Sequence, residues 1–126
     1  MSGPKKSCGC SCDSEITVIF PCSGSADVGE LSDRLARKLT KKGRGQMSCL
    51  AGIGGNVSGM VQAAKSADKI LVIDGCPVNC AKKTLEQKKI KKLTHFVVTD
   101  NGFTKGKSKV SAGSINTLLK RCLEVL

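Results

Sequence analysis

Three apolar runs divide the chain, and polar segments with helical periodicity lie between them. The runs are rich in branched residues that suit buried strands and cover residues 16–20, 70–73 and 96–98. In the first polar segment, apolar residues recur at the spacing of an amphipathic helix, at Val28, Leu31, Leu35 and Leu39. This pattern predicts buried strands alternating with helices that bury one face.

The complete set of expected elements follows this alternation. We predict strands at residues 16–20, 47–50, 69–74 and 95–99. We predict helices at residues 27–42, 57–66, 77–89 and 111–126. Such alternation with short connections indicates an α/β protein, in which a mostly parallel sheet is covered by helices on both faces. We therefore expect a small three-layer α/β/α sandwich with a four-stranded sheet in the order 2-1-3-4.

The boundaries of this domain follow from the distribution of large apolar side chains. The first fourteen residues contain almost none, so we expect a flexible cysteine-containing tail at residues 1–14 and a single α/β cysteine-rich metal-binding domain at residues 15–126. Residues 102–113 are polar and Lys-rich, which predicts a mobile loop. No run approaches the roughly 18 residues of a membrane span, and the first fifteen residues do not resemble a signal peptide. We expect a cytoplasmic protein without membrane contact.

The formal net charge of +11 raises the question of a nucleic-acid partner. Lys and Arg are spread along the chain, however, and the sequence has three Phe, no Trp and no Tyr with which to stack bases. The composition therefore disfavours specific nucleic-acid binding, and solvated helix faces account for most of the charge. Nothing in the sequence identifies a protein partner.

Eight cysteines are the strongest chemical signal in the chain. In a reducing compartment, cysteine-dense chains more often bind metal or perform thiol chemistry than form disulfides. Cys22 follows the first predicted strand, Cys49 ends the second, Cys76 follows the third and Cys80 comes four residues later. The carboxyl ends of parallel strands share one edge, where ligands bind in open α/β sheets, so we expect these four thiols at one site.

The segment around Cys76 and Cys80 carries the most specific pattern. Pro77 suits the first turn of a helix, so we expect Cys76 to cap that helix and Cys80 to follow one turn later. A helix N-terminus favours the thiolate, which is the form that coordinates metal and attacks electrophiles. For Cys49 alone, a role as a small core residue is a competing interpretation. We predict that Cys122, among the leucines of the last helix, belongs to the core.

Three segments resemble one known family. They are FPCSGSADVGE at residues 20–30, CLAGIGG at 49–55 and IDGCPVNCA at 73–81, and the likeness extends to VTD at 98–100. In this order they closely resemble the DGC family of zinc-binding proteins. The resemblance implies a small prokaryotic metal-binding protein, gives no reaction, and marks Cys22, Cys49, Cys76 and Cys80 as the family's cysteine positions.

The remaining motifs are less specific. Cys8, Cys10 and Cys12 offer closely spaced thiols that suit soft metals, either as auxiliary donors or as part of a disordered tail. His95, the only histidine, begins the fourth predicted strand, so we expect it at the edge opposite the cysteines. The glycines at residues 52–55 lack both the third Gly of a dinucleotide fingerprint and a following Gly-Lys-Ser/Thr.

Three functions share these cysteines. The leading hypothesis is zinc held by three or four thiolates drawn from Cys22, Cys49, Cys76 and Cys80. The second is a thiol redox or sulfur-transfer enzyme, with Cys76 or Cys80 as nucleophile and Cys22 or Cys49 as resolving partner. The third is an iron–sulfur electron carrier. Whether the protein is an enzyme stays open at this stage.

Overall fold

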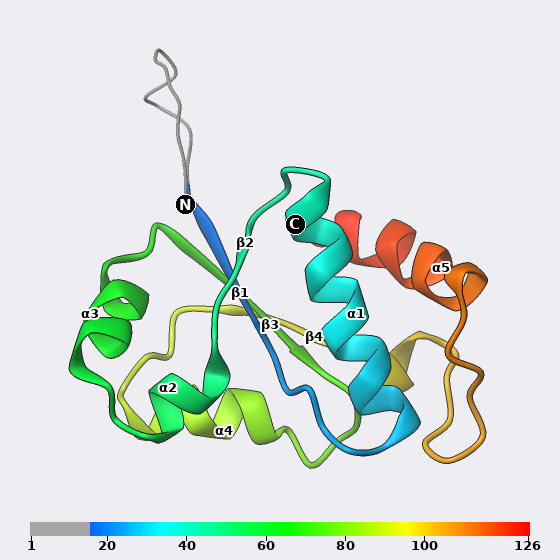
Figure 1. Cartoon of the computed structure of the whole chain (residues 1–126), viewed down its shortest axis with the longest axis horizontal. Coiled ribbons are helices and arrows are strands. Elements are labelled where there is room, and N and C mark those ends of the chain that lie inside the picture. The colour runs from blue at the N-terminus through cyan, green and yellow to red at the C-terminus, as the bar shows by residue number, and fades with distance from the viewer. Residues whose placement is uncertain (1–15) are drawn as a thin grey trace.

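A computed structural model describes residues 16–126 and places four parallel strands in one sheet (Figure 1). The strands are β1 (Thr17–Pro21), β2 (Gln46–Met47), β3 (Lys69–Asp74) and β4 (Thr94–Val97). Their order is β2-β1-β3-β4, and every neighbouring pair is parallel. The predicted α/β class and the strand order 2-1-3-4 are confirmed. The predicted tail, with Cys8, Cys10 and Cys12, lies outside the described residues.

Helices cover both faces of this sheet (Figure 1). On one face lie α1 (Asp27–Lys41) and α5 (Ala112–Leu123), and on the other lie α2 (Leu50–Gly54), α3 (Ser58–Ser66) and α4 (Cys80–Gln87). Alternate residues of β3 serve the two layers, since Leu71 joins the core under α1 and α5 whereas Val72 joins the core under α3 and α4. In the part of the chain described, no helix is long and apolar enough to cross a membrane.

The first helix forms as its apolar periodicity predicts. Val28, Leu31, Leu35 and Leu39 are all buried in α1 against the sheet. Acidic side chains stand in the first turn and basic ones in the last, the arrangement that the helix dipole favours. Gly43 follows with a φ of 72°, a left-handed conformation that glycine adopts at little cost. This accurate prediction rests on a stripe wide enough to be read from sequence alone.

Three boundaries differ from the sequence-based expectation. The second strand has only two residues, and residues 50–54 form the short helix α2 instead of a glycine-rich connection. The last strand ends at Val97, and η3 (Val98–Asn101), a short 3₁₀ helix, follows it. The helix expected at residues 77–89 begins only at Cys80, because Asn79 has a φ of 60° and interrupts any earlier turn.

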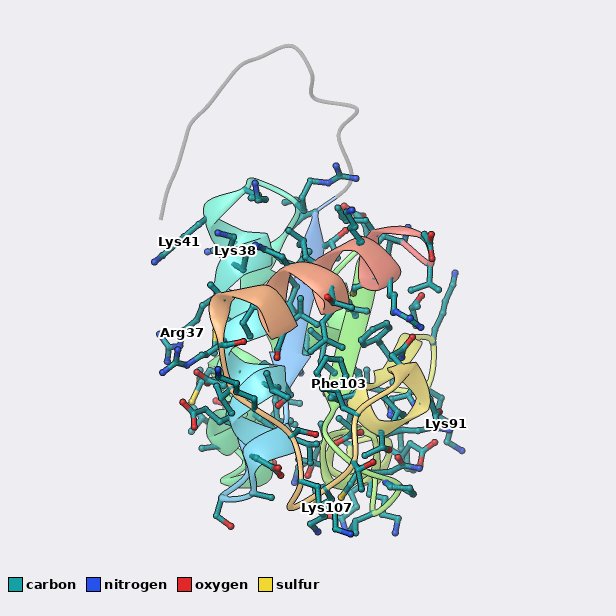
Figure 2. The ribbon with its side chains drawn as sticks, turned by 90° about the vertical axis from the view of Figure 1, so that its right-hand side faces the viewer. Arg37, Lys38, Lys41, Lys91, Phe103 and Lys107 are labelled. Atoms are coloured by element: carbon teal, nitrogen blue, oxygen red, sulfur yellow. The ribbon has the colours of Figure 1, made fainter. Side chains whose placement is uncertain are left out.

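The Lys-rich segment expected to be a mobile loop makes specific contacts with the start of α1. The backbone N–H groups of Gly106 and Ser108 each donate a 2.8 Å hydrogen bond to the Asp27 carboxylate. Phe103 packs against the core on the side of the sheet that α5 covers, while Lys107 stands at the far end of the loop (Figure 2). The loop is therefore held at two points, by hydrogen bonds to the Asp27 carboxylate and by packing of the Phe103 ring against the core.

Candidate thiol site

The segments that carry two of the predicted cysteines meet where β1 and β3 end side by side. Pro21 pairs with Ile73 in the sheet, so Cys22 and Gly75 leave it close together. The Cys22 N–H donates to the Ile73 carbonyl at 2.9 Å, and the Gly75 N–H donates to Cys22 Sγ at 3.4 Å. The segments that carry Cys22 and Cys76 therefore share the carboxyl edge of the sheet, as parallel pairing requires.

A cavity of about 310 Å³ opens at this edge, and three thiols line it. These are Cys22, Cys76 and Cys80, accompanied by Asn79 and Lys105. Cys22 and Cys76 are partly buried, whereas Cys80 is exposed. Among residues 16–126, no three His, Cys, Asp or Glu side chains stand close enough to form a ready-made metal cage. The three thiols thus line one cavity but do not stand close enough together to form a preformed metal site.

The start of α4 is held by Asp74 and not by Cys76. The Ala81 and Lys82 N–H groups donate to the two oxygens of the Asp74 carboxyl group, at 2.8 and 3.2 Å. These N–H groups belong to the first turn of α4, where backbone N–H groups have no hydrogen-bond acceptor within the helix itself. Cys76 instead lies in the turn before the helix, and Cys80 is the first helical residue. The expected cap at Cys76 was wrong because the left-handed Asn79 delays the helix by one turn.

His95 supports the same carboxyl group. Its Nε2 lies 2.8 Å from Asp74 Oδ2, and Asp74 is only 1 % exposed. We expected His95 at the opposite edge, but the short β4 starts halfway along β3, so that His95 pairs with Val72. The imidazole therefore reaches the carboxyl edge and holds Asp74 in place. The sequence signal for Asp74 is an acidic residue at the end of a buried apolar run.

The loop fixed by Asp27 brings a cation to the thiols. Lys105 Nζ lies 3.6 Å from Cys76 Sγ, within hydrogen-bonding distance for sulfur. The loop closes on itself around this residue, because the Thr104 N–H donates to the Ser108 hydroxyl oxygen at 2.9 Å. The contact thus places the Lys105 side chain of the Lys-rich segment 102–113 at the approach to Cys76 from the cavity.

Replacing Asp27 with Ala should release this loop and make Cys76 more accessible. Hydrogen bonds from the Gly106 and Ser108 N–H groups hold the pKa of Asp27 below its ordinary value. The stabilisation of the folded protein by the Asp27 carboxylate is therefore complete above the ordinary pKa of about 3.9. It is lost as the pH falls through the lower pKa of the folded state.

We expect alkylation of Cys76 in metal-free protein to be several times faster in Asp27→Ala, measured by mass-resolved labelling at neutral pH. Asp100→Asn is the exposed control, and an unchanged Cys76 rate would contradict the anchoring role.

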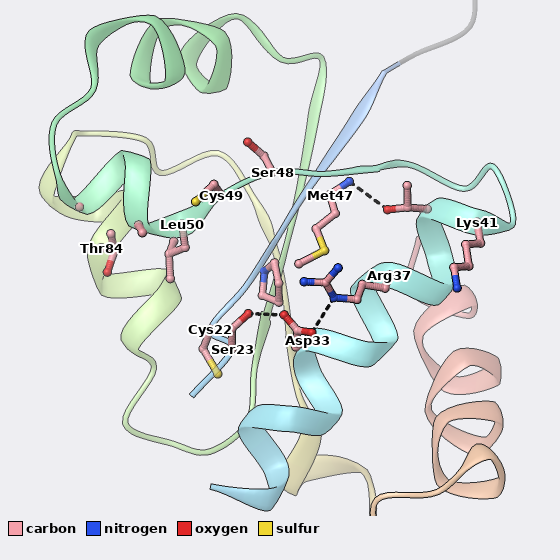
Figure 3. Close-up of a pocket in the computed structure, with 14 residues that line it drawn as sticks. Cys22, Ser23, Asp33, Arg37, Lys41, Met47, Ser48, Cys49, Leu50 and Thr84 are labelled. Atoms are coloured by element: carbon pink, nitrogen blue, oxygen red, sulfur yellow. Dashed lines mark hydrogen bonds and ion pairs between the residues drawn. The ribbon is translucent and has the colours of Figure 1, made fainter. Parts of the chain in front are cut away.

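Cys49 lies beside a second and larger cavity, of about 900 Å³ (Figure 3). Its thiol is exposed and does not line the smaller cavity, whereas Cys22 lines both. In Figure 3, Cys49 stands with Ser48 at the upper border of the larger cavity, and Cys22 stands at the lower border. The structure therefore brings three of the four predicted cysteines to one cavity and leaves Cys49 in the neighbouring one.

Cys122 belongs to α5 and is fully buried in the core, as its position among leucines predicted. Burial raises the pKa of the Cys122 thiol to about 12. We expect this thiol to resist alkylation, with or without chelator, until the protein unfolds. Cys122→Ala should lower the free energy of unfolding by about 1 kcal/mol through the small cavity it leaves. Denaturant unfolding and mass-resolved alkylation measure the two effects, and rapid labelling of native Cys122 would contradict its placement.

Together the fold and the site define a cysteine-rich α/β domain with free thiols at the carboxyl edge of a parallel sheet. Residues 18–122 match the DGC domain, and the chain belongs to the DGC domain family. It is similar to the anaerobic and virulence modulator AnvM of Pseudomonas aeruginosa, with 35% identity over 93 residues, which cover 74% of this chain and 71% of AnvM. No solved structure matches the chain.

Proposed function

We propose that this protein is a cytoplasmic metal-binding module that holds zinc through the thiolates of Cys22, Cys76 and Cys80. The observation that carries the proposal is the single cavity that these three thiols line. Zinc favours thiolate ligands and tetrahedral geometry, and it needs no redox partner. Free thiols on all five described cysteines agree with a reducing compartment.

Two further features of the cavity fit a bound metal. Cys22 Sγ lies within hydrogen-bonding distance of the Gly75 N–H, at 3.4 Å, and of the Ser32 hydroxyl, at 3.3 Å, and such contacts orient sulfur ligands. Asn79 Oδ1 is buried but has no hydrogen-bond partner among residues 16–126. A buried polar atom without a partner is uncommon and suggests an additional group nearby.

Cys49 enters the proposal as the fourth ligand predicted from the sequence. Because it lines the neighbouring cavity, a four-thiolate centre would require the segment around Cys49 to move toward Cys22. Three thiolates alone would leave one zinc position open to water or to a small ligand. Bound zinc would supply a Lewis acid at that position, and the protein's own contribution is to hold the three sulfur ligands and Lys105 in place.

Metal analysis of variants tests the assignment. Full-length protein purified anaerobically should contain about one zinc per chain, and Cys76→Ser and Cys80→Ser should each lose most of it. Cys122→Ser should keep its metal, because that side chain lies in the core and not at the cavity. A colourless loaded protein would favour zinc, and a brown one would favour the iron–sulfur alternative. Full metal content in Cys76→Ser would contradict the proposal.

A thiol redox or sulfur-transfer enzyme is the second candidate. The Lys105 ammonium group 3.6 Å from Cys76 Sγ favours it, because reactive cysteines of thiol enzymes commonly lie in electropositive surroundings. The two functions differ in how the thiols respond to chelation. A metal centre predicts slow alkylation of Cys76 and Cys80 in loaded protein and fast alkylation after metal removal, whereas a resting nucleophile predicts fast alkylation in both. Mass-resolved labelling with and without chelator separates them.

A further inference from the structure

The larger cavity has the size and lining of a small-molecule site. Its volume of about 900 Å³ lies within the range of roughly 300 to 1,000 Å³ that such sites occupy. It lies between α1 and the segment from β2 to α2, and Met47, Leu50 and Ala51 give it an apolar wall (Figure 3). Sites of this kind bury the apolar body of a ligand and fix its orientation with a few polar groups.

Arg37 is the polar group best placed to select a ligand. Its Nε donates to Asp33 Oδ2 at 2.7 Å, and the Ser23 hydroxyl donates to Asp33 Oδ1 at 2.8 Å. Burial disfavours ionisation of Asp33, but the hydrogen bonds from Arg37 and Ser23 outweigh it and hold the pKa of this carboxyl below its ordinary value. Asp33 is therefore a fixed negative charge at neutral pH, and it orients the guanidinium.

The outer face of this guanidinium is available to a ligand. Within residues 16–126 its two terminal nitrogens have no hydrogen-bond partner, and Figure 3 shows them pointing toward the side chain of Met47, which also lines the cavity. A guanidinium presents a planar pair of donors that matches a carboxylate. Lys41 also lines the cavity, so the lining carries two cations and one carboxylate. This surplus of positive charge favours an anion.

Cys49 supplies a reactive group at the same cavity. Its thiol is exposed, and it stands apart from the cavity shared by Cys22, Cys76 and Cys80. An exposed thiol at the border of a cavity that is also lined by a cation and an apolar wall can react with a small disulfide that carries a carboxylate. The charged end would pair with Arg37, the apolar body would rest on Met47 and Leu50, and a sulfur would approach Cys49.

We propose that the larger cavity is a site for small anionic disulfides, in which Arg37 holds the carboxylate and Cys49 forms a mixed disulfide with the ligand. The Cys49 thiol first loses its proton to water. The thiolate then attacks one ligand sulfur, so that a bond forms between Cys49 Sγ and that sulfur while the ligand's own S–S bond breaks. The other half of the ligand leaves as a thiolate, and no further oxidant or reductant is required.

Two probe disulfides of different charge test the site in full-length protein with its metal retained. Dithiobis(nitrobenzoate) carries carboxylates, whereas dithiodipyridine is uncharged; both release a leaving group whose absorbance follows the total reaction, and mass mapping of timed samples gives the rate at Cys49. Mass mapping should locate the first adduct on Cys49. Arg37→Gln should slow the anionic probe at Cys49 about tenfold, corresponding to one lost charge-assisted contact, and should leave the uncharged probe within about twofold.

Arg34→Gln is the matched control. Arg34 lies one turn earlier on α1 and pairs with Glu30 at 2.9 Å, in the same spacing as Arg37 with Asp33, but it does not line the cavity. It should leave both probe rates within about twofold, because a distant exposed charge is largely screened by salt. If Arg34→Gln and Arg37→Gln slowed the anionic probe equally, the general surface charge would explain the rate, and the proposed site would be contradicted.

Other outcomes also decide the proposal. First reaction at Cys22, or protection of Cys49 until a chelator is added, would overturn it, and the latter would favour a four-thiolate metal centre instead. If Arg37→Gln does not fold, competition in the unmodified protein replaces it. Nitrobenzoate should then slow the anionic probe at Cys49, whereas uncharged nitrobenzyl alcohol should not. Equal competition by both compounds would contradict recognition of the carboxylate.

Discussion

Asp74→Ala is expected to lower the free energy of unfolding by about 3 kcal/mol, the largest loss of stability among the changes considered. The Asp74 carboxyl group accepts hydrogen bonds from the Ala81 and Lys82 N–H groups and lies 2.8 Å from His95 Nε2. With the carboxyl group removed, buried donors at the start of α4 lose their partners, and that penalty exceeds the cost of any single hydrogen bond. Denaturant unfolding at neutral pH measures the change.

Asp68→Asn is the control for this prediction. Asp68 is exposed and accepts one hydrogen bond, from the Ile16 N–H at 3.2 Å, so its replacement should change stability by less than about 0.5 kcal/mol. Asp74→Asn should fall between the two, because it keeps one acceptor oxygen but places an NH₂ group among N–H donors. Equal stability of Asp74→Ala and Asp68→Asn would show that Asp74 does not hold α4.

Gly75→Ala is expected to cause the second largest loss of stability. Gly75 lies just before Cys76, where the turn between β3 and α4 packs against α1. A Cβ at this position would meet the Val28 carbonyl group at 2.7 Å and the Gly29 nitrogen at 2.9 Å. Both are backbone atoms of a packed helix and cannot move cheaply, so we expect a loss of about 2 kcal/mol in stability. The shift would also separate Cys76 from Cys22, and we expect metal affinity to fall about tenfold.

Gly59→Ala shows what the same change does without a neighbour. A Cβ at Gly59 would meet nothing within 4 Å, and the residue lies in α3, where Ala is the better helix former. It should raise stability by about 0.5 kcal/mol and leave metal affinity unchanged. If Gly75→Ala matched Gly59→Ala in both stability and metal affinity, the close approach of Gly75 to α1 would not be needed for folding or for metal binding.

The strands and α1 were predictable because the spacing of their apolar residues in the sequence indicates which positions are buried. Residues 70–73 form a continuous apolar run since β3 is covered on both faces, and the helical stripe from Val28 to Leu39 repeats over three turns. The strand order also followed, because crossover connections allow few topologies. Periodicity thus determined both the class of the fold and the edge at which the cysteines emerge.

The details of the site could not be obtained in this way. Pro77 favours a helix start, but the left-handed Asn79 delays that start to Cys80, where Asp74 holds the first turn. Likewise, Arg37 is one of 21 Lys and Arg residues, and nothing in its local sequence distinguishes it from Arg34. Arg37 pairs with Asp33 in the same i,i+4 spacing in which Arg34 pairs with Glu30, so its special position depends on Ser23 and on the cavity that β2 and α2 complete. These tertiary contacts leave no pattern in the sequence around Arg37.

X-ray absorption at the zinc edge of the metal-loaded, full-length protein tests the central claim most directly, because it reports the atoms bonded to the metal. We expect a first shell dominated by sulfur at about 2.3 Å, with at least three thiolates, and a loss of sulfur from that shell in Cys76→Ser and Cys80→Ser. The Cys122→Ser spectrum should match that of the unmodified protein. A shell of nitrogen and oxygen at about 2.0 Å, unchanged in the Cys76→Ser and Cys80→Ser variants, would contradict a thiolate metal site at the carboxyl edge of the sheet.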